Sequence, residues 1–245
     1  MAFDWGEDPL GERDIVSVHK AVPLFNEAAA APGGNGMTRV LTQMRLLSES
    51  HSLGFAYVSP TEAGTRYHRR EVVEGLARQP VHTKDALVRR LRGAVPSSSA
   101  VLVLRQRERT PIREGHRQVF GPRGEVLYER NWYGYDRRMD RSADPDERRQ
   151  QDDASREVWS VSAANARLVD DAEAQGGFLP LVISVGGLIV SCREILGFDR
   201  DREEAGRLLP QRSFRVRPAG DWAEPILDTW LDSGAGKAAL WWSLR

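Results

Sequence analysis

Residues 178–195 read FLPLVISVGGLIVSCREI, and this stretch contains the clearest strand signal in the chain. Two apolar runs of strand length, residues 178–185 and 188–195, lie on either side of Gly186-Gly187. Short apolar runs bounded by glycines are typical of buried strands. A pair of small turn residues between two such runs is typical of a two-residue hairpin turn. The stretch therefore predicts a β-hairpin.

The elements that follow this hairpin, and the one before it, show periodic signals of their own. Residues 160–175 predict a helix that Ser160 caps and that Gly176-Gly177 ends, and residues 213–217 predict a further strand. Asp221 and Glu224 form a capping-box-like start for a final helix, residues 221–230. We expect the closing segment, residues 239–242 (Ala-Leu-Trp-Trp), to pack against the core.

The first half of the chain divides into an arm and a helix-rich unit. Residues 1–36 end in AAAAPGGNG, a composition that favours a loop, and we assign them to an N-terminal arm and linker. Residues 37–110 predict helices from 38 to 47, from 67 to 78 and after the N-cap Thr83, with strands over 53–58 and 100–104. This order is compatible with a winged-helix-like unit.

Residues 111–245 form the third part of the predicted layout. A hairpin is expected over 118–120 and 125–128, around GPRG, while the charged residues 140–153 predict a solvated helix or a mobile loop. Together with the strands near the C-terminus, these signals predict an α+β protein with boundaries at 36/37 and 110/111.

Composition excludes several classes of protein. No apolar run approaches the roughly 18 residues that span a bilayer, so we expect no membrane partner. The N-terminus, MAFDWGED, lacks the basic and apolar regions of a signal peptide, which predicts a cytoplasmic protein. Cys192 is the only cysteine, so no intrachain disulfide forms, and its apolar neighbours predict a buried thiol.

The motifs of common enzyme sites are incomplete. GAGK at residues 234–237 lacks both the earlier glycine and the following Ser or Thr of a phosphate loop, since Leu231 and Ala238 occupy those positions. The five histidines show no metal-ligand spacing, and no lysine has an acidic residue two positions earlier, as the common nuclease core requires. We therefore assign no catalytic residue and leave enzyme activity open, and we predict no metal site and no cofactor, except Mg²⁺ if the protein is a divergent nuclease.

Basic residues give the one positive indication of a ligand. Formal net charge is zero, but 32 of the 35 basic residues are arginines, and guanidinium groups bind phosphate and base edges bidentately. In one cluster arginines bracket aromatic side chains, a mixture suited to phosphate contact and base stacking. Its residues are Arg130, Trp132, Tyr133, Tyr135, Arg137 and Arg138. The alternative is an ordinary edge strand with its tryptophan in the core.

A family resemblance points the same way. Residues 128–130 (YER), 156–162 (REVWSVS), the hairpin strands and residues 213–216 (SFRV) follow one another as in the small PUA-like domains that are fused to prokaryotic nucleases. The stretch 127–217 resembles them, although it lacks the Gly-x-Lys-x-x-Glu signature of the related ASCH domains. The resemblance implies a small β-barrel with flanking helices and a cleft for a nucleotide or a base, often a modified one. It places Arg156, Trp159 and Ser162 near that cleft, or else gives Trp159 the role of fixing a helix to the barrel.

Three hypotheses follow for function. The first is a nucleic-acid recognition protein, for DNA rather than RNA, that reads modified or foreign DNA in restriction or nucleic-acid processing. The second is a divergent Mg²⁺-dependent restriction-type endonuclease. The third is a non-catalytic regulatory subunit that assembles with a protein partner through Trp241-Trp242.

Overall fold

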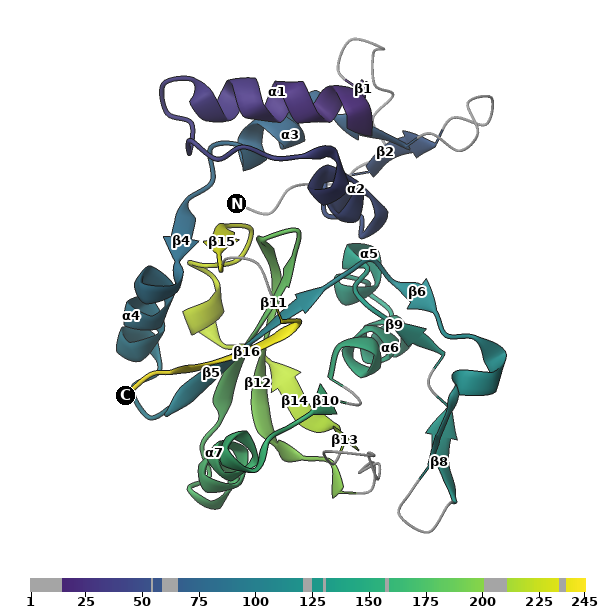
Figure 1. Ribbon diagram of the computed structural model, residues 1–245, viewed down its shortest axis with the longest axis vertical. Coiled ribbons are helices and arrows are strands. Elements are labelled where there is room, and N and C mark those ends of the chain that lie inside the picture. The colour runs from purple at the N-terminus through teal and green to yellow at the C-terminus, as the bar shows by residue number, and fades with distance from the viewer. Residues whose placement is uncertain are drawn as a thin grey trace.

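The structure, a computed structural model, describes residues 15–53, 55–58, 66–120, 125–129, 131–156, 159–200, 211–233 and 237–245. Helices and strands are mixed in it, as the α+β prediction requires. Figure 1 shows an N-terminal lobe above a central sheet, with a group of short elements beside the sheet.

The N-terminal lobe is a small sheet covered by three helices. Its strands pair antiparallel in the order β1-β3-β2, and α1 packs against both α2 and α3. The elements are β1 (Ile15–Ser17), α1 (Val18–Ala30), α2 (Leu41–Glu49), β2 (Phe55–Val58), β3 (Arg66–Arg69) and α3 (Arg70–Leu76). The helix predicted from residue 67 begins only at Arg70, because residues 66–69 pair with β1 and β2 as a strand.

Residues 15–30, which the composition assigned to the N-terminal arm, belong to the core of this lobe. Ala21, Phe25 and Ala29 recur every four residues along α1, and all three are buried. These three residues form the side of α1 that packs against the rest of the lobe. In the described part of residues 1–36, β1 and α1 occupy residues 15–30. The loop begins only at Ala31.

The central sheet has seven strands. Its order is β16-β5-β11-β12-β15-β4, and β14 also pairs with β12. The strands are β4 (Val81–Thr83), β5 (Ala100–Gln106), β11 (Leu179–Val185), β12 (Leu188–Phe198), β14 (Phe214–Pro218), β15 (Trp230–Asp232) and β16 (Ala239–Ser243). α4 (Lys84–Ala94) joins β4 to β5, and its N-cap Thr83 accepts a hydrogen bond from the Ala86 N–H, as predicted.

The predicted hairpin is confirmed as β11 and β12. They pair antiparallel, and Gly186 and Gly187 have φ angles of 57° and 89°, as a two-residue turn of the primed type requires. On its other side β11 runs parallel to β5. A parallel pair needs a crossover, and the segment between β5 and β11 contains α7 (Ala163–Ala174), which packs against β12.

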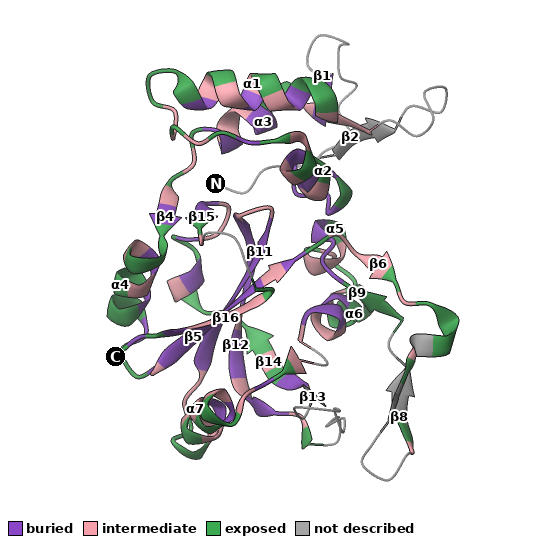
Figure 2. Ribbon diagram, viewed as in Figure 1, coloured by how far each residue is buried: buried purple, intermediate pink, exposed green. Residues whose placement is uncertain are grey.

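Figure 2 shows that the central strands are largely buried, and hydrophobic cores lie on both faces of the sheet. In β5, Leu102 and Leu104 belong to the core that continues into the N-terminal lobe, whereas Val101 and Val103 face a second core under α4. This alternation places β5 between two cores. Cys192 is buried in the second core, which confirms the predicted core thiol.

The elements beside the sheet are short and form two-stranded ribbons and two helices. They are β6 (Thr110–Pro111), β7 (Gln118–Phe120), β8 (Val126–Glu129), β9 (Trp132–Tyr133), α5 (Arg137–Asp140), α6 (Pro145–Arg156), β10 (Trp159–Ser160) and β13 (Gln211–Arg212). β7 pairs with β8 as predicted, β6 with β9, and β10 with β13. Figure 1 shows β7 and β8 extending away from the sheet, and we call residues 112–131 the hairpin arm.

One further helix boundary and one whole predicted helix are wrong. Ser162, not Ser160, caps α7, because Ser160 is held in β10. The final helix over 221–230 is absent: residues 221–223 form a short 3-10 helix, and Trp230 lies in β15. Asp228 has a φ of 60°, which an α-helix does not allow, and Trp230 is fully buried beside Val81 of β4.

The described sheets are all open, so none of them closes into the barrel that the PUA-like resemblance implies. The predicted boundary at 110/111 falls at β6, after β5 has already joined the central sheet. None of the helices among the described residues combines the length and the apolar character that crossing a lipid bilayer requires.

Candidate nucleic-acid interface

Trp132 and Tyr133 are the predicted aromatic site residues that the structure presents to solvent. They form β9 and have exposed fractions of 37% and 44%. Large aromatic side chains are usually buried, so two adjacent exposed ones mark a candidate contact surface. Pairing of β9 with β6 holds both residues on a ribbon at the base of the hairpin arm.

Arg109 completes this aromatic surface. Its guanidinium carbon lies 4.3 Å from the centre of the Trp132 ring, in a cation–π contact. The Arg109 Nε is buried and has no hydrogen-bond partner in the described part of the chain, while one terminal nitrogen donates to Gln150 at 3.4 Å. Burial lowers the pKa of Arg109. A stacked arginine with a donor to spare is a suitable contact for a phosphate or a base edge.

Gly134 makes the ribbon possible. It has a φ of +91°, and a Cβ built on it would lie 2.1 Å from the Glu108 carbonyl oxygen. Only glycine allows the two chain segments to approach so closely. Tyr135 N–H then donates to the Arg107 carbonyl at 2.9 Å, and Arg109 N–H donates to the Tyr135 carbonyl at 3.0 Å.

The remaining described members of the predicted cluster have structural roles. Tyr135 is fully buried, and its hydroxyl donates to Asp140 at 2.9 Å and to the Val190 carbonyl at 3.1 Å. Arg137 is buried and pairs with Asp228 at 2.7 Å, while the exposed Arg138 pairs with Asp136 at 3.0 Å. The structure therefore separates Trp132 and Tyr133 from the charged residues that follow them in the sequence. Arg130 lies outside the described residues.

The residues implied by the family resemblance also serve the fold. Arg156 is half-buried and donates to Asp153 at 2.7 Å and to the Phe214 carbonyl at 2.9 Å. Trp159 donates through Nε1 to the Ser155 carbonyl of α6 at 2.9 Å and packs against the main core. Ser162 caps α7 by accepting from the Asn165 N–H.

A set of arginines that the sequence-based prediction missed lies in the segment from β5 to β7, which includes Arg109. Within the part of the chain that the structure describes, none of them forms an ion pair with a carboxylate. The set consists of Arg105, Arg107, Arg109, Arg113 and Arg117. Arg105, Arg107 and Arg109 occupy alternate positions of an extended segment in which Gln106 is buried. This alternation of arginines with other residues is the sequence pattern that could have predicted that they share one face.

We call residues 105–133 the basic ribbon. The sequence of this segment contains seven arginines and only four glutamates, although the whole chain is neutral. It carries the exposed aromatic pair, the stacked Arg109 and the projecting hairpin arm. An arrangement of this kind can neutralise phosphates and stack unpaired bases.

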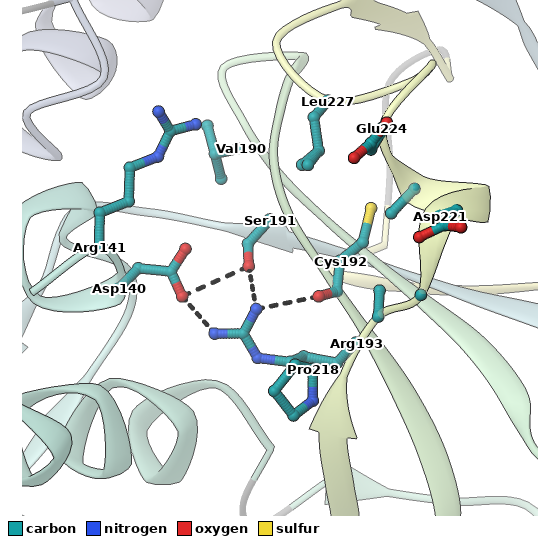
Figure 3. A pocket seen from close by; sticks show the side chains of 13 residues that line it. Asp140, Arg141, Val190, Ser191, Cys192, Arg193, Pro218, Asp221, Glu224 and Leu227 are labelled. Atoms are coloured by element: carbon teal, nitrogen blue, oxygen red, sulfur yellow. Dashed lines mark hydrogen bonds and ion pairs between the residues drawn. The ribbon is translucent and has the colours of Figure 1, made fainter. Parts of the chain in front are cut away.

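A cavity of about 240 Å³ lies beside α5. It is next to the part of β12 between the residues that pair with β15 and those that pair with β14. Leu188 of β12 pairs with β15, and β14 pairs from Arg193 onward. Ile183 pairs with Ser191 and Ser184 with Ile189, so Val190 is an extra, bulged residue in β12. Bulges are common beside functional sites. Figure 3 shows Asp140 and Arg141 on one side of the cavity and Asp221 and Glu224 on the other.

Arg193 lines this cavity, and its guanidinium group already has several hydrogen-bond acceptors. It donates to Asp140, to Asp152 at 2.8 Å, to the Ser191 hydroxyl at 2.8 Å and to the Cys192 carbonyl at 2.9 Å. Burial alone lowers its pKa, but the two carboxylates outweigh that effect and raise it. Arg193 therefore acts as a cross-link between α5, α6 and β12.

Nucleophilic chemistry at Cys192 is disfavoured. Burial raises the pKa of its thiol above the ordinary value, so the thiol stays protonated at neutral pH. Among the described residues, no group of three His, Cys, Asp or Glu side chains is placed to hold a metal ion. The closing segment is the edge strand of the central sheet, since β16 pairs with β5; Trp242 is buried and Trp241 is partly buried.

Comparisons of the chain with protein-family models, with curated proteins and with solved structures found no match.

Proposed function

We propose that this protein recognises nucleic acid through the basic ribbon. The observation that carries the proposal is the exposed pair Trp132 and Tyr133 with Arg109 stacked on Trp132. Arg105, Arg107, Arg113 and Arg117, which pair with no described carboxylate, would add phosphate contacts. Such contacts supply much of the affinity for nucleic acid.

Double-stranded DNA is the favoured ligand because of the shape of the hairpin arm. A two-stranded β-ribbon fits the major groove of B-form DNA, whereas the major groove of A-form RNA is too narrow for protein side chains to read. β7 and β8 form a ribbon of this kind, and Figure 1 shows it extending from the molecule. In this arrangement the hairpin arm contacts the groove, while Trp132 and Tyr133 stack on a base that is unpaired or taken out of the duplex.

The finer proposal concerns modified or foreign DNA. It rests on the PUA-like resemblance of residues 127–217 and on the winged-helix-like order of elements in residues 37–110. An enzyme or reader that acts on one base takes it out of the stack into a pocket. The cavity beside Ser191 has both polar and apolar walls, which suits a base, and it adjoins α5, the helix that follows β9.

The test is fluorescence anisotropy with labelled duplex and single-stranded oligonucleotides at salt concentrations of about 50 and 200 mM. We expect duplex binding that weakens steeply with salt. For oligonucleotides that contain unpaired bases, the W132A/Y133A variant should bind about tenfold or more weakly, since stacking contributes roughly 1–3 kcal/mol per unpaired base. R107Q/R113Q should lower the salt slope by about 0.9 for each phosphate that the variant no longer neutralises.

The matched control is R89Q/R90Q, which removes two adjacent exposed arginines from α4, on the far side of the central sheet from α6 in Figure 1. It should bind like the wild type. Absence of binding at low salt, or equal affinity in the ribbon variants, would contradict the proposal. Loss of intact oligonucleotide only when Mg²⁺ is present would favour the endonuclease hypothesis instead.

A further inference from the structure

A second cleft, of about 400 Å³, lies between α6 and β14. We call it the α6–β14 cleft. Figure 1 shows α6 beside β14, on the side of the sheet that also carries β9. Its charged lining consists of Arg148, Arg149, Asp152, Asp153, Arg156 and Arg215.

The spacing of these residues explains why they share one cleft. Along α6 they occur at intervals of three and four, which places them on one side of the helix. Gln151, Ala154 and Ser155 occupy the buried side of the same helix. From β14, Arg215 is directed away from the core, because Phe214 before it is buried.

Both carboxylates of the cleft are already engaged. Asp152 accepts from Arg193 at 2.8 Å, and Asp153 accepts from Arg156 at 2.7 Å. Arg156 is further fixed by Asp199 at 3.3 Å. These pairs occupy both carboxylates of the cleft, so its other arginines either pair with carboxylates outside the cleft or form no ion pair among the described residues.

Three arginines remain available. Arg148 is half-buried and donates to the Ser142 carbonyl, but it forms no ion pair with any carboxylate of the described residues. Arg149 has only an exposed pair with Asp146 at 3.1 Å, and such pairs contribute little. Arg215 pairs with the partly exposed Glu173. Neighbouring like charges repel one another, and an anion in the cleft would relieve that repulsion.

We propose that the α6–β14 cleft is a binding site for a phosphate group, held by Arg148, Arg149 and Arg215. Guanidinium groups bind phosphate oxygens bidentately, and several of them around one cleft can surround the anion. The ion pairs of Asp152 and Asp153 keep the cleft wall rigid in this arrangement. This site is separate from the basic ribbon and does not depend on the function proposed for it.

Inorganic pyrophosphate is the probe, measured by isothermal titration calorimetry on the full chain at constant ionic strength. We expect binding by the wild type and affinity at least about tenfold lower in R148Q/R149Q, because each substitution removes a charge-assisted hydrogen-bond donor. R149Q/R215Q changes two largely exposed side chains, so it keeps the test valid if the first variant folds poorly. R89Q/R90Q on α4 is again the matched control and should bind like the wild type.

No pyrophosphate binding by the wild type would overturn the proposal, and so would equal binding by the cleft variants. Oligonucleotide binding by the cleft variants distinguishes two sources of the phosphate, a nucleic-acid backbone and a free phosphate compound. If R148Q/R149Q also lowers the salt slope for DNA, the cleft takes a backbone phosphate. If DNA binding is unchanged while pyrophosphate binding is abolished, the cleft takes a free phosphate compound. If the ribbon variants bind DNA with the affinity of the wild type, the proposed function is contradicted but the pyrophosphate result still stands.

Discussion

Ion pairing divides the arginines of this chain into two groups with different roles. Arg137 and Arg193 are largely buried and are held by carboxylates, so they cross-link elements of the fold. A buried arginine is tolerated only with such partners, and removing one partner costs about 3–5 kcal/mol. Arg107 and Arg113 are exposed and form no ion pair in the described part of the chain, so their charge is available to a ligand.

Asp136 gives a prediction at this scale. Burial alone would raise its pKa, but contacts with His51, 3.3 Å away, and Arg138 outweigh burial and hold the pKa well below its ordinary value. A lowered pKa in the folded state means that ionised Asp136 stabilises the fold above its unfolded pKa, and that this stabilisation is lost as pH falls.

We expect D136N to lower the free energy of unfolding at pH 7 by about 1.5–3 kcal/mol, the range for a charged hydrogen bond. The difference from the wild type should shrink as pH falls from about 5 through the ordinary aspartate pKa near 3.8. Urea unfolding at several pH values measures it. D146N, at an exposed pair, is the control and should change little. A difference in the free energy of unfolding between D136N and the wild type that stays constant with pH would contradict the stabilising role of ionised Asp136.

At the scale of elements, the described strands of the hairpin arm form a ribbon separate from the central sheet. Among the described strands, β7 and β8 pair only with one another. The Ile112 N–H donates to the Asn131 carbonyl, and Arg117 Nε donates to the Ile112 carbonyl, so these contacts stay within the hairpin arm. An element with few contacts to the core adds little to global stability, and loops of this kind commonly carry function.

Replacing residues 112–131 with Asn-Gly tests this view. Pro111 pairs with Trp132, so a two-residue turn can close the β6–β9 ribbon. We expect a change of less than about 1 kcal/mol in the free energy of unfolding, as for other surface changes. DNA affinity and its salt slope should both fall, because Arg113, Arg117, Arg123 and Arg130 are removed. Unchanged DNA binding would show that the hairpin arm is not part of the interface.

At the scale of the whole molecule, the lobe and the sheet share one core. Trp230 of β15 is fully buried, and its ring centre lies 5.4 Å from that of Phe25 in α1. The same side chain donates through Nε1 to the Leu76 carbonyl of α3 at 2.7 Å, and Arg39 stacks on its ring at 4.2 Å. β5 lies between β11 and β16, so residues far apart in the sequence complete one sheet.

The fragment of residues 111–245 should therefore fail to unfold cooperatively. It lacks β5, which is buried on both faces and pairs with two of the fragment's strands. The full chain should show one transition, with circular dichroism and tryptophan fluorescence coinciding. A cooperative transition in the fragment would show that the predicted boundary at 110/111 separates independent domains.

Local sequence determined the elements whose signals lie within a few neighbours. The β11–β12 hairpin, the Thr83 cap and the strand over residues 100–104 follow from apolar runs, turn glycines and a hydroxyl acceptor. These features are decided by short-range sterics and hydrogen bonds, which a sequence displays directly.

Tertiary structure alone decided where charges and polar side chains are neutralised. Arg137 and Arg107 look alike in the sequence, but Asp228 lies beside the first and no described carboxylate pairs with the second. In the same way, pairing with Val81 and burial of the ring place Trp230 in a strand rather than the predicted helix. Burial and pairing depend on residues distant along the chain, so only the folded molecule separates the arginines that hold it together from those available to bind.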